Sequence, residues 1–106
     1  MTERKIVLTT VGSREEGHKL AQALVERRLA ACVNVLGPIA SVYRWKGAVE
    51  SAEEWLLLIK TTAEAVAGVQ TAIKELHSYE LPECVVLPIE GGSEEYLAWV
   101  GENVGI

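Results

Sequence analysis

Two long strand-like stretches joined by a short turn place the strongest constraint on how this chain folds. Residues 31–45 and 48–61 are rich in β-branched, aromatic and leucine side chains, and Lys46-Gly47 lies between them. Each stretch holds about 14 residues, whereas strands of globular proteins usually have about 3–10. Such a strand is roughly 45 Å long, and a helix of four turns covers about half of that length. Part of this hairpin must therefore project beyond its own domain.

The projecting end of the hairpin carries large apolar side chains. Tyr43, Trp45 and Val49 lie near its tip, and residues 55–59 are apolar on both faces of their strand. Exposed strands of this kind aggregate unless something covers them. The sequence therefore predicts an oligomer in which neighbouring subunits extend the sheet edges and cover its faces.

A break is expected within the first of these strands. Gly37-Pro38 interrupts its alternation, and we expect a bulge or bend there because proline cannot donate to a strand ladder. The alternating side chains of this strand are expected to lie on one side, namely Val33, Val35, Ile39, Tyr43 and Trp45. The alternative to a projecting hairpin is one that folds back at this break.

Capping signals mark where the helices of the chain begin. Ser13 with Glu16 forms a capping box that predicts a helix after it, and Thr61 with Glu64 predicts a second one. Ser93 is expected to cap a short last helix, because its hydroxyl can accept from a free backbone N–H group. Apolar residues at three- and four-residue spacing follow each of these signals.

The remaining strands complete the order of elements. Residues 5–11 predict a central strand, and residues 84–89 predict an edge strand because Pro88 lies within them. The resulting order is β-α-β-β-α-β-α. It predicts a single α+β domain over residues 1–106, with a four-stranded antiparallel sheet and both main helices on one face.

Composition excludes several classes of function. The net charge is −5, carried by Glu alone, and no basic cluster suggests binding to nucleic acid or to an anionic membrane surface. No stretch approaches the ~18 apolar residues of a membrane span, and the short first apolar run predicts a strand rather than a signal peptide. A cytoplasmic location is expected, with Cys32 and Cys84 reduced and buried.

Five blocks of the sequence, in the same order and with the same gaps, resemble the CutA family of divalent-cation tolerance proteins. The blocks are LVERRLAACVNV (24–35), SVYRWKGAV (41–49), EWLLLIKTT (54–62), HSYELPECVVLPI (77–89) and EYLAWV (95–100). The resemblance implies a ferredoxin-like βαββαβ fold with an extra C-terminal helix, assembled as a homotrimer. It also implies an association with copper and other divalent metals, without catalysis. Likeness of such trimers to the nitrogen-regulatory PII proteins implies the alternative of a regulatory trimer that binds a small anionic ligand between subunits.

The chain departs from the copper-linked members of that family at the residues that resemble their metal site. Thr9 stands where those members have a cysteine near the end of the first strand. Their His-His pair becomes Leu76-His77, and Ser78 replaces the following proline. Of the residues that resemble this metal site, only His77 is the same in this chain.

The residues suggest two candidate sites. His77 with Glu80 and Glu83 could hold a divalent ion such as Cu²⁺ or Zn²⁺ weakly, although a histidine near a helix C-terminus is also favourable against the helix dipole. A ligand cleft between subunits is predicted from polar and aromatic residues inside the family-like blocks: Trp45, Glu54, Lys60 and Tyr79. The alternative for these four is interface packing, with Glu54 and Lys60 as an ion pair.

An enzymatic alternative rests on the segment Gly12-Ser13-Arg14. Acylphosphatases share this order of strands and helices and hold phosphate with a loop and an arginine after the first strand. The glycine-rich signature of that loop is missing from this chain, and its motifs assemble no Ser/His/acid or Cys/His constellation. The sequence therefore predicts a protein that is not an enzyme.

Overall fold

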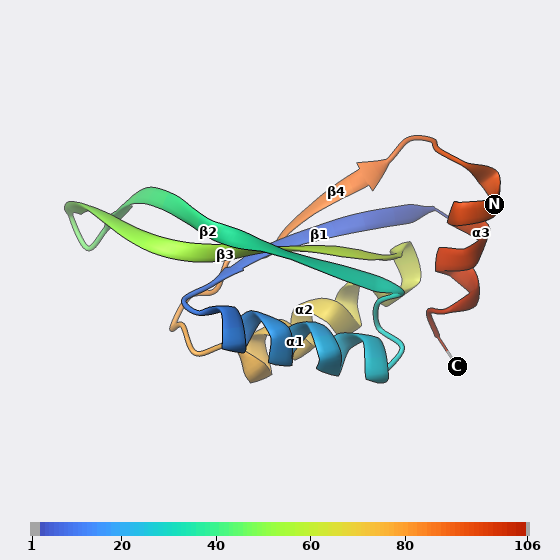
Figure 1. Cartoon of the computed structure of the whole chain (residues 1–106), viewed down its shortest axis with the longest axis horizontal. Coiled ribbons are helices and arrows are strands. Elements are labelled where there is room, and N and C mark those ends of the chain that lie inside the picture. The colour runs from blue at the N-terminus through green and yellow to red at the C-terminus, as the bar shows by residue number, and fades with distance from the viewer. Residues whose placement is uncertain (1–2, 106) are drawn as a thin grey trace.

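The long hairpin dominates the shape of the molecule. In the computed structural model, which describes residues 3–105, β2 (Cys32–Trp45) and β3 (Ala48–Thr62) are joined by Lys46 and Gly47. Both turn residues have positive φ angles, 50° and 83°, as the tight turn of a two-residue hairpin requires. The tip of the hairpin extends beyond the helices (Figure 1), and the molecule measures 44 × 25 × 22 Å. The projecting hairpin predicted from strand length is confirmed.

Two further strands complete the antiparallel sheet within residues 3–105. β1 (Arg4–Val11) pairs with β3 on one side and with β4 (Val85–Ile89) on the other, so the sheet order is β2-β3-β1-β4. The predicted central position of β1 and the predicted edge position of β4 are therefore confirmed. Pro88 sits in the edge strand, where a missing donor costs least.

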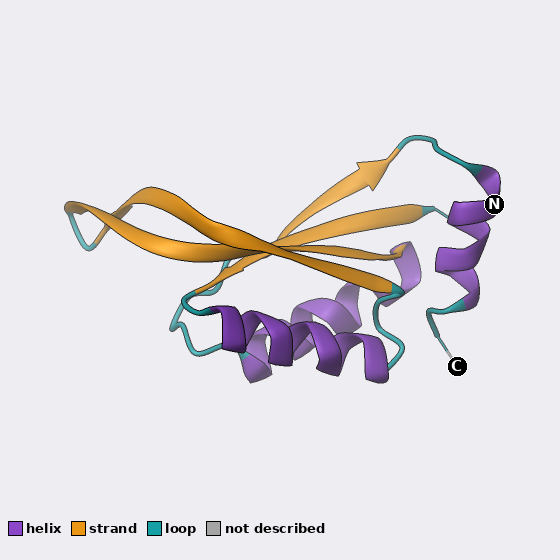
Figure 2. Cartoon of the chain, viewed as in Figure 1, coloured by secondary structure: helices purple, strands orange, loops and turns teal. Residues whose placement is uncertain are grey.

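Two helices cover one face of this sheet and a third lies at its end (Figure 2). α1 (Arg14–Glu26) and α2 (Val66–Leu76) form the covering layer, and the 3-10 turn η1 (Ala63–Ala65) leads into α2. α3 (Glu94–Glu102) follows β4. The predicted α+β fold of ferredoxin-like order, with an extra C-terminal helix, is confirmed. The core lies between sheet and helices and is built from Val7, Val11, Leu20, Leu24, Leu57, Ile59, Val69 and Ile73.

One of the two predicted capping boxes is wrong and the other is half-formed. The Ser13 hydroxyl accepts from the Glu16 backbone N–H at 3.1 Å, as predicted, but the Glu16 side chain does not reach back to the cap. Thr61 lies inside β3 instead of capping a helix, and its buried hydroxyl donates to the Leu29 carbonyl at 2.7 Å. The strand runs further than expected because pairing with β1 continues past Thr61. The residue before α2 is Ala65, which offers no side-chain cap.

The last helix is fastened to the first strand. Ser93 accepts from the backbone of Tyr96 at 3.3 Å and so caps α3 as predicted. Arg4 of β1 is buried and donates from Nε to the Leu97 carbonyl at 2.8 Å. Gly101 lets the guanidinium approach, since a Cβ at this position would lie 2.2 Å from Arg4 Nη2. Both cysteines are free thiols, as predicted, but they are half-buried rather than buried.

A bulge interrupts the hairpin where it leaves the helices. The register shifts between Leu36 and Ile39, so that Gly37 and Pro38 of β2 lie opposite the single residue Trp55 of β3. The Trp55 ring packs against Gly37, where an added Cβ would lie 2.4 Å from Trp55 Cδ1. The expected bulge at Gly37-Pro38 is confirmed.

The bulge also reverses which residues of β2 face which side, and this corrects the predicted alternation. Val33 and Val35 lie opposite residues of β3 that face the helices. The extra residue shifts the alternation by one, so that Ile39, Tyr43 and Trp45 pair with residues of the other face. These five side chains therefore do not lie on one side of the strand.

Candidate functional site

The segment between α2 and β4 is fastened to the end of β1 by His77. The His77 side chain is fully buried, and its Nε2 lies 2.6 Å from the Thr10 carbonyl oxygen. A carbonyl can only accept, so Nε2 carries the proton of this hydrogen bond. Nδ1 lies 3.0 Å from the Tyr79 backbone nitrogen and accepts from its N–H. These two hydrogen bonds match the tautomer of His77 that carries its proton on Nε2.

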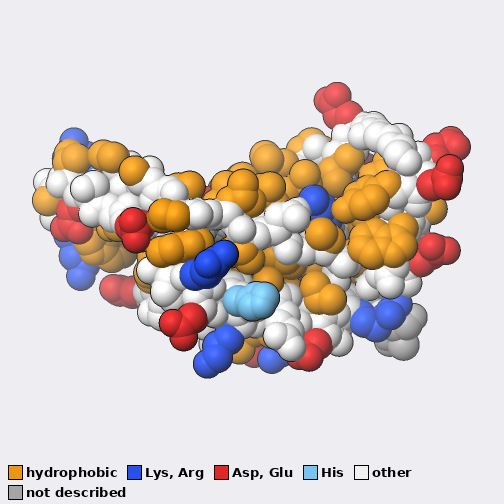
Figure 3. Space-filling view, in the orientation of Figure 1, with side chains coloured by type: hydrophobic (Ala, Val, Ile, Leu, Met, Phe, Trp, Pro, Cys, Tyr) orange, Lys and Arg blue, Asp and Glu red, His pale blue; other side chains and the backbone are white. Residues whose placement is uncertain are grey.

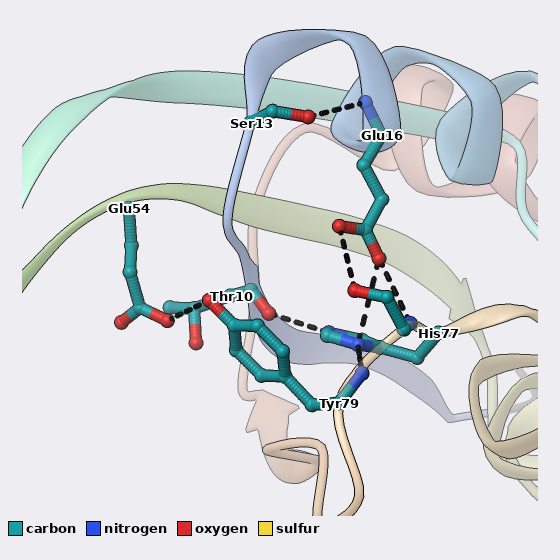
Figure 4. A network of polar contacts seen from close by, with 7 residues as sticks. Thr10, Ser13, Glu16, Glu54, His77 and Tyr79 are labelled. Carbon is teal, nitrogen blue, oxygen red and sulfur yellow. Dashed lines mark hydrogen bonds and ion pairs between the residues drawn. The ribbon is translucent and has the colours of Figure 1, made fainter.

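A second fastening comes from Glu16 in the first turn of α1 (Figure 4). Its carboxylate accepts from the Ser78 backbone N–H and from the Ser78 hydroxyl, both at 3.0 Å. One of its oxygens also lies 3.6 Å from His77 Nδ1. The acid that was predicted to cap its own helix therefore holds the α2–β4 segment instead.

Tyr79 links this segment to the hairpin. Its hydroxyl donates to the Glu54 carboxylate at 2.8 Å (Figure 4). Burial of the phenol, followed by the hydrogen bond to Glu54 and the charge of that carboxylate, raises the pKa of Tyr79. The ring also packs against His77, with centroids 4.6 Å apart. These contacts fix Tyr79 as one wall of a pocket.

The pocket lies between the projecting part of the hairpin and the α2–β4 segment, and it has a volume of about 590 Å³. We call it the acidic pocket, because four carboxylates line it and none of its described lining residues is Lys, Arg or His. It also contains three aromatic rings. Its lining residues are Thr10, Ser41, Val42, Tyr43, Trp45, Glu50, Glu54, Tyr79, Glu80, Leu81 and Glu83.

Most of the predicted cleft residues meet in this pocket, but one does not. Trp45, Glu54 and Tyr79 line it together. Lys60 lies elsewhere, opposite Cys32 on the sheet, where its Nζ donates to Asn34 Oδ1 at 2.5 Å. The suggested Glu54–Lys60 ion pair is therefore wrong. Without Lys60 the pocket has no cation for an anionic ligand, so its charge does not favour the alternative of an anion-binding cleft.

The predicted metal ligands are separated by the structure. Glu80 and Glu83 line the acidic pocket, whereas both ring nitrogens of His77 are already hydrogen-bonded. No group of three or more His, Cys, Asp or Glu side chains within residues 3–105 is placed to hold a metal ion. Within one subunit the set His77, Glu80 and Glu83 is thus not assembled.

Six further lining residues were not identified as site residues from the sequence. Thr10, Tyr43 and Glu50 belong to the pocket, although Tyr43 was noted only as exposed apolar surface. Tyr43 and Glu50 face each other across the hairpin. The signal that could have found them is the Gly37-Pro38 bulge, because a one-residue shift of the alternation places Tyr43 and Trp45 on the side of Glu54.

None of the described helices is long and apolar enough to cross a membrane. The sequence profile of one family, described as CutA1 divalent ion tolerance protein, matches residues 5–103. The divalent-cation tolerance protein CutA of Thermus thermophilus is 50% identical over 101 residues, which cover 95% of this chain and 98% of that protein. The chloroplastic CutA protein of Arabidopsis thaliana is 45% identical over 95 residues, covering 90% of this chain but only 52% of that protein. The chain thus spans about half the length of this plant relative.

Solved structures agree with the sequence comparisons. The Thermus thermophilus divalent cation tolerance protein has a TM-score of 0.94 at 49% identity, over 96% of this chain and 99% of that one. A CutA from Archaeoglobus fulgidus, described as periplasmic, has a TM-score of 0.93 at 39% identity, over 96% and 99% of the two chains.

Proposed function

The chain belongs to the CutA1 divalent ion tolerance family, and on that premise we propose that it is a homotrimer that binds a divalent metal ion and does not catalyse a reaction. The observation that carries this proposal is the acidic pocket, whose carboxylates have no basic residue beside them among its described lining residues. The proposed location is the cytoplasm, where thiols such as those of the two free cysteines stay reduced.

Carboxylates, and not imidazole, are the proposed ligands. Glu80 and Glu83 are exposed at the pocket, and carboxylate oxygens bind divalent ions. His77 would have to give up a buried hydrogen bond to Thr10 or to the Tyr79 backbone before it could bind a metal. Because three ligands do not converge within the described residues of one subunit, affinity is expected to be weak unless a neighbouring subunit contributes.

The proposed trimer is supported by apolar surface that the helices leave uncovered. Leu36, Val85 and Leu87 lie on the helix-free face of the sheet and are 43%, 44% and 42% exposed. Val42 and Val49 on the hairpin are 72% and 66% exposed. Figure 3 shows hydrophobic side chains at the surface along the hairpin and the sheet. Apolar patches of this extent are typical of protein interfaces, and β2 and β4 offer free strand edges for pairing.

Two measurements test the proposal. Light scattering on the purified protein should give three times the mass of the 11.5 kDa chain, and a monomer would contradict the assembly. Isothermal titration with Zn²⁺ and Cu²⁺ should show binding that a Glu80→Gln/Glu83→Gln variant weakens by more than about tenfold, because carboxylate count sets affinity in such sites. The control, Glu94→Gln/Glu95→Gln, removes the same charge outside the pocket. Binding lost in His77→Gln but kept in the Glu80/Glu83 variant would refute the carboxylate site.

A further inference from the structure

The inner part of the acidic pocket contains a buried carboxylate, and none of the described residues that line the pocket is Lys, Arg or His. Glu54 is only 7% exposed, and the hydroxyl of Tyr79 is the one donor to its carboxylate among residues 3–105. Thr10 is 9% exposed, and its hydroxyl has no hydrogen-bond partner in the same part of the chain. The second carboxylate oxygen and the hydroxyl keep acceptor capacity that a positively charged donor in the pocket would satisfy.

Three aromatic rings stand around these polar groups. Tyr43, Trp45 and Tyr79 all line the pocket. The face of an aromatic ring attracts an ammonium group, and cages of such rings recognise organic cations. The chain itself gives an example, since the Lys46 ammonium lies 5.6 Å from the centroid of the Trp45 ring.

The remaining carboxylates are spread apart rather than gathered at one point. Glu50, Glu80 and Glu83 are exposed and form the rim of the pocket, while Glu54 is buried within it. No three of these acids are placed to hold a single metal ion within the described chain. A volume of about 590 Å³ is within the range of small-molecule pockets and far exceeds what one bare ion needs.

We infer that the acidic pocket binds an elongated organic diamine or polyamine. One ammonium group donates to the Glu54 carboxylate and the Thr10 hydroxyl. The aliphatic chain lies against the aromatic rings, and a second ammonium group meets the carboxylates at the rim. The pocket carboxylates lie too far apart to hold one metal ion together. Their separation suits a ligand whose two ammonium groups are joined by an alkyl chain.

This site goes beyond the proposed function and does not depend on it. The lining residues that the structure describes all come from one subunit. The inner residues Thr10, Glu54 and Trp45 serve the amine alone, whereas the rim acids Glu80 and Glu83 are the proposed metal ligands. Variants of the two sets therefore separate a failure of this inference from a failure of the metal proposal.

The test is isothermal titration of the full chain with spermidine, and with Mg²⁺ as a small divalent cation. Spermidine is expected to bind, and Glu54→Gln is expected to weaken it by about tenfold, since a charge-assisted hydrogen bond is lost. Glutamine keeps the volume of Glu54 and can still accept from Tyr79, so the fold is preserved. Trp45→Leu should weaken spermidine by about three- to tenfold and leave Zn²⁺ binding unchanged.

Matched controls distinguish specific binding of spermidine in the pocket from its non-specific attraction to a negatively charged protein. Glu90→Gln removes one exposed charge outside the pocket and should change the affinity less than twofold. The inference is overturned if spermidine does not bind, if Mg²⁺ displaces it at equal concentration, or if Glu90→Gln weakens it as much as Glu54→Gln. Thr10→Val tests the second inner acceptor: an unchanged affinity would remove the hydroxyl from the site and contradict the inferred position of the inner ammonium group.

Discussion

Two buried threonines on the same face of the sheet allow the cost of an unpaired hydroxyl to be measured within one protein. Thr9 of β1 and Thr61 of β3 are both 0% exposed and face the helices. The Thr61 hydroxyl donates to the Leu29 carbonyl at 2.7 Å. The Thr9 hydroxyl has no hydrogen-bond partner within residues 3–105. Replacing each by valine exchanges a hydroxyl for a methyl group of almost the same shape.

The two substitutions should change stability in opposite directions. Thr9→Val removes a buried polar group that gains nothing in the folded state, and it should raise the free energy of unfolding by about 1–2 kcal/mol. Thr61→Val breaks a hydrogen bond and leaves the Leu29 carbonyl without this donor, so it should lower the same free energy by about 1–2 kcal/mol.

Equilibrium unfolding in guanidinium chloride, followed by circular dichroism at one fixed protein concentration, measures both effects. A fixed concentration is needed because association would contribute to the apparent stability. The slopes of the transitions should agree among wild type and variants, so that a shift in midpoint reports a change in stability. The reasoning is refuted if Thr9→Val lowers the midpoint, or if the two variants shift it in the same direction by similar amounts.

Two further predictions concern the bulge and the tyrosine at the pocket. Gly37→Ala places a Cβ 2.4 Å from Trp55 Cδ1 and should lower the free energy of unfolding by about 1–3 kcal/mol. In the control Gly91→Ala, the added Cβ meets nothing within 4 Å. Equal denaturant midpoints for the two variants would contradict the packing of Trp55 on Gly37. The pKa of Tyr79 is raised in the folded state, so its protonated hydroxyl contributes to stability. This contribution is complete below the ordinary tyrosine pKa of about 10 and decreases as the pH rises toward the folded-state pKa. Denaturant midpoints between about pH 8 and pH 11 should therefore fall more steeply for wild type than for Tyr79→Phe, and parallel curves would show that Glu54 and burial do not hold the proton there.

Much of the fold could be predicted from sequence because its signals are local. Strand length, Ser13, Ser93 and the Gly37-Pro38 break each act on nearby residues, and they correctly predicted the projecting hairpin, the two serine caps and the bulge. The capping box at Thr61 failed because pairing with β1 extends β3 through this residue, and such pairing depends on residues far along the chain. A local pattern cannot weigh a tertiary contact of this kind.

The candidate site was harder to predict, for the same physical reason. Trp45, Glu54 and Tyr79 were named together, but their neighbour Lys60 was included because it shares a sequence block with Glu54. In the structure these two residues lie six positions apart along an extended strand, and Lys60 bonds to Asn34 beyond the bulge. His77 had the chemistry of a metal ligand, yet its nitrogens are taken by Thr10 and by the Tyr79 backbone. The identity of each side chain indicated which interactions it can make. Its partners in the folded structure determine which of these interactions it does make.

The bulge connects the predicted oligomer with the pocket. Without the extra residue, Tyr43 and Trp45 would continue the alternation of Val33 and Val35 and would point toward the side of the helices. Because the register shifts, both rings lie on the side of Glu54 instead, and they can form a wall of the acidic pocket. The hairpin must project past the helices for this wall to exist, since α1 and α2 would otherwise limit its length (Figure 1). The strand length that predicts an oligomer is therefore also the feature that forms the acidic pocket.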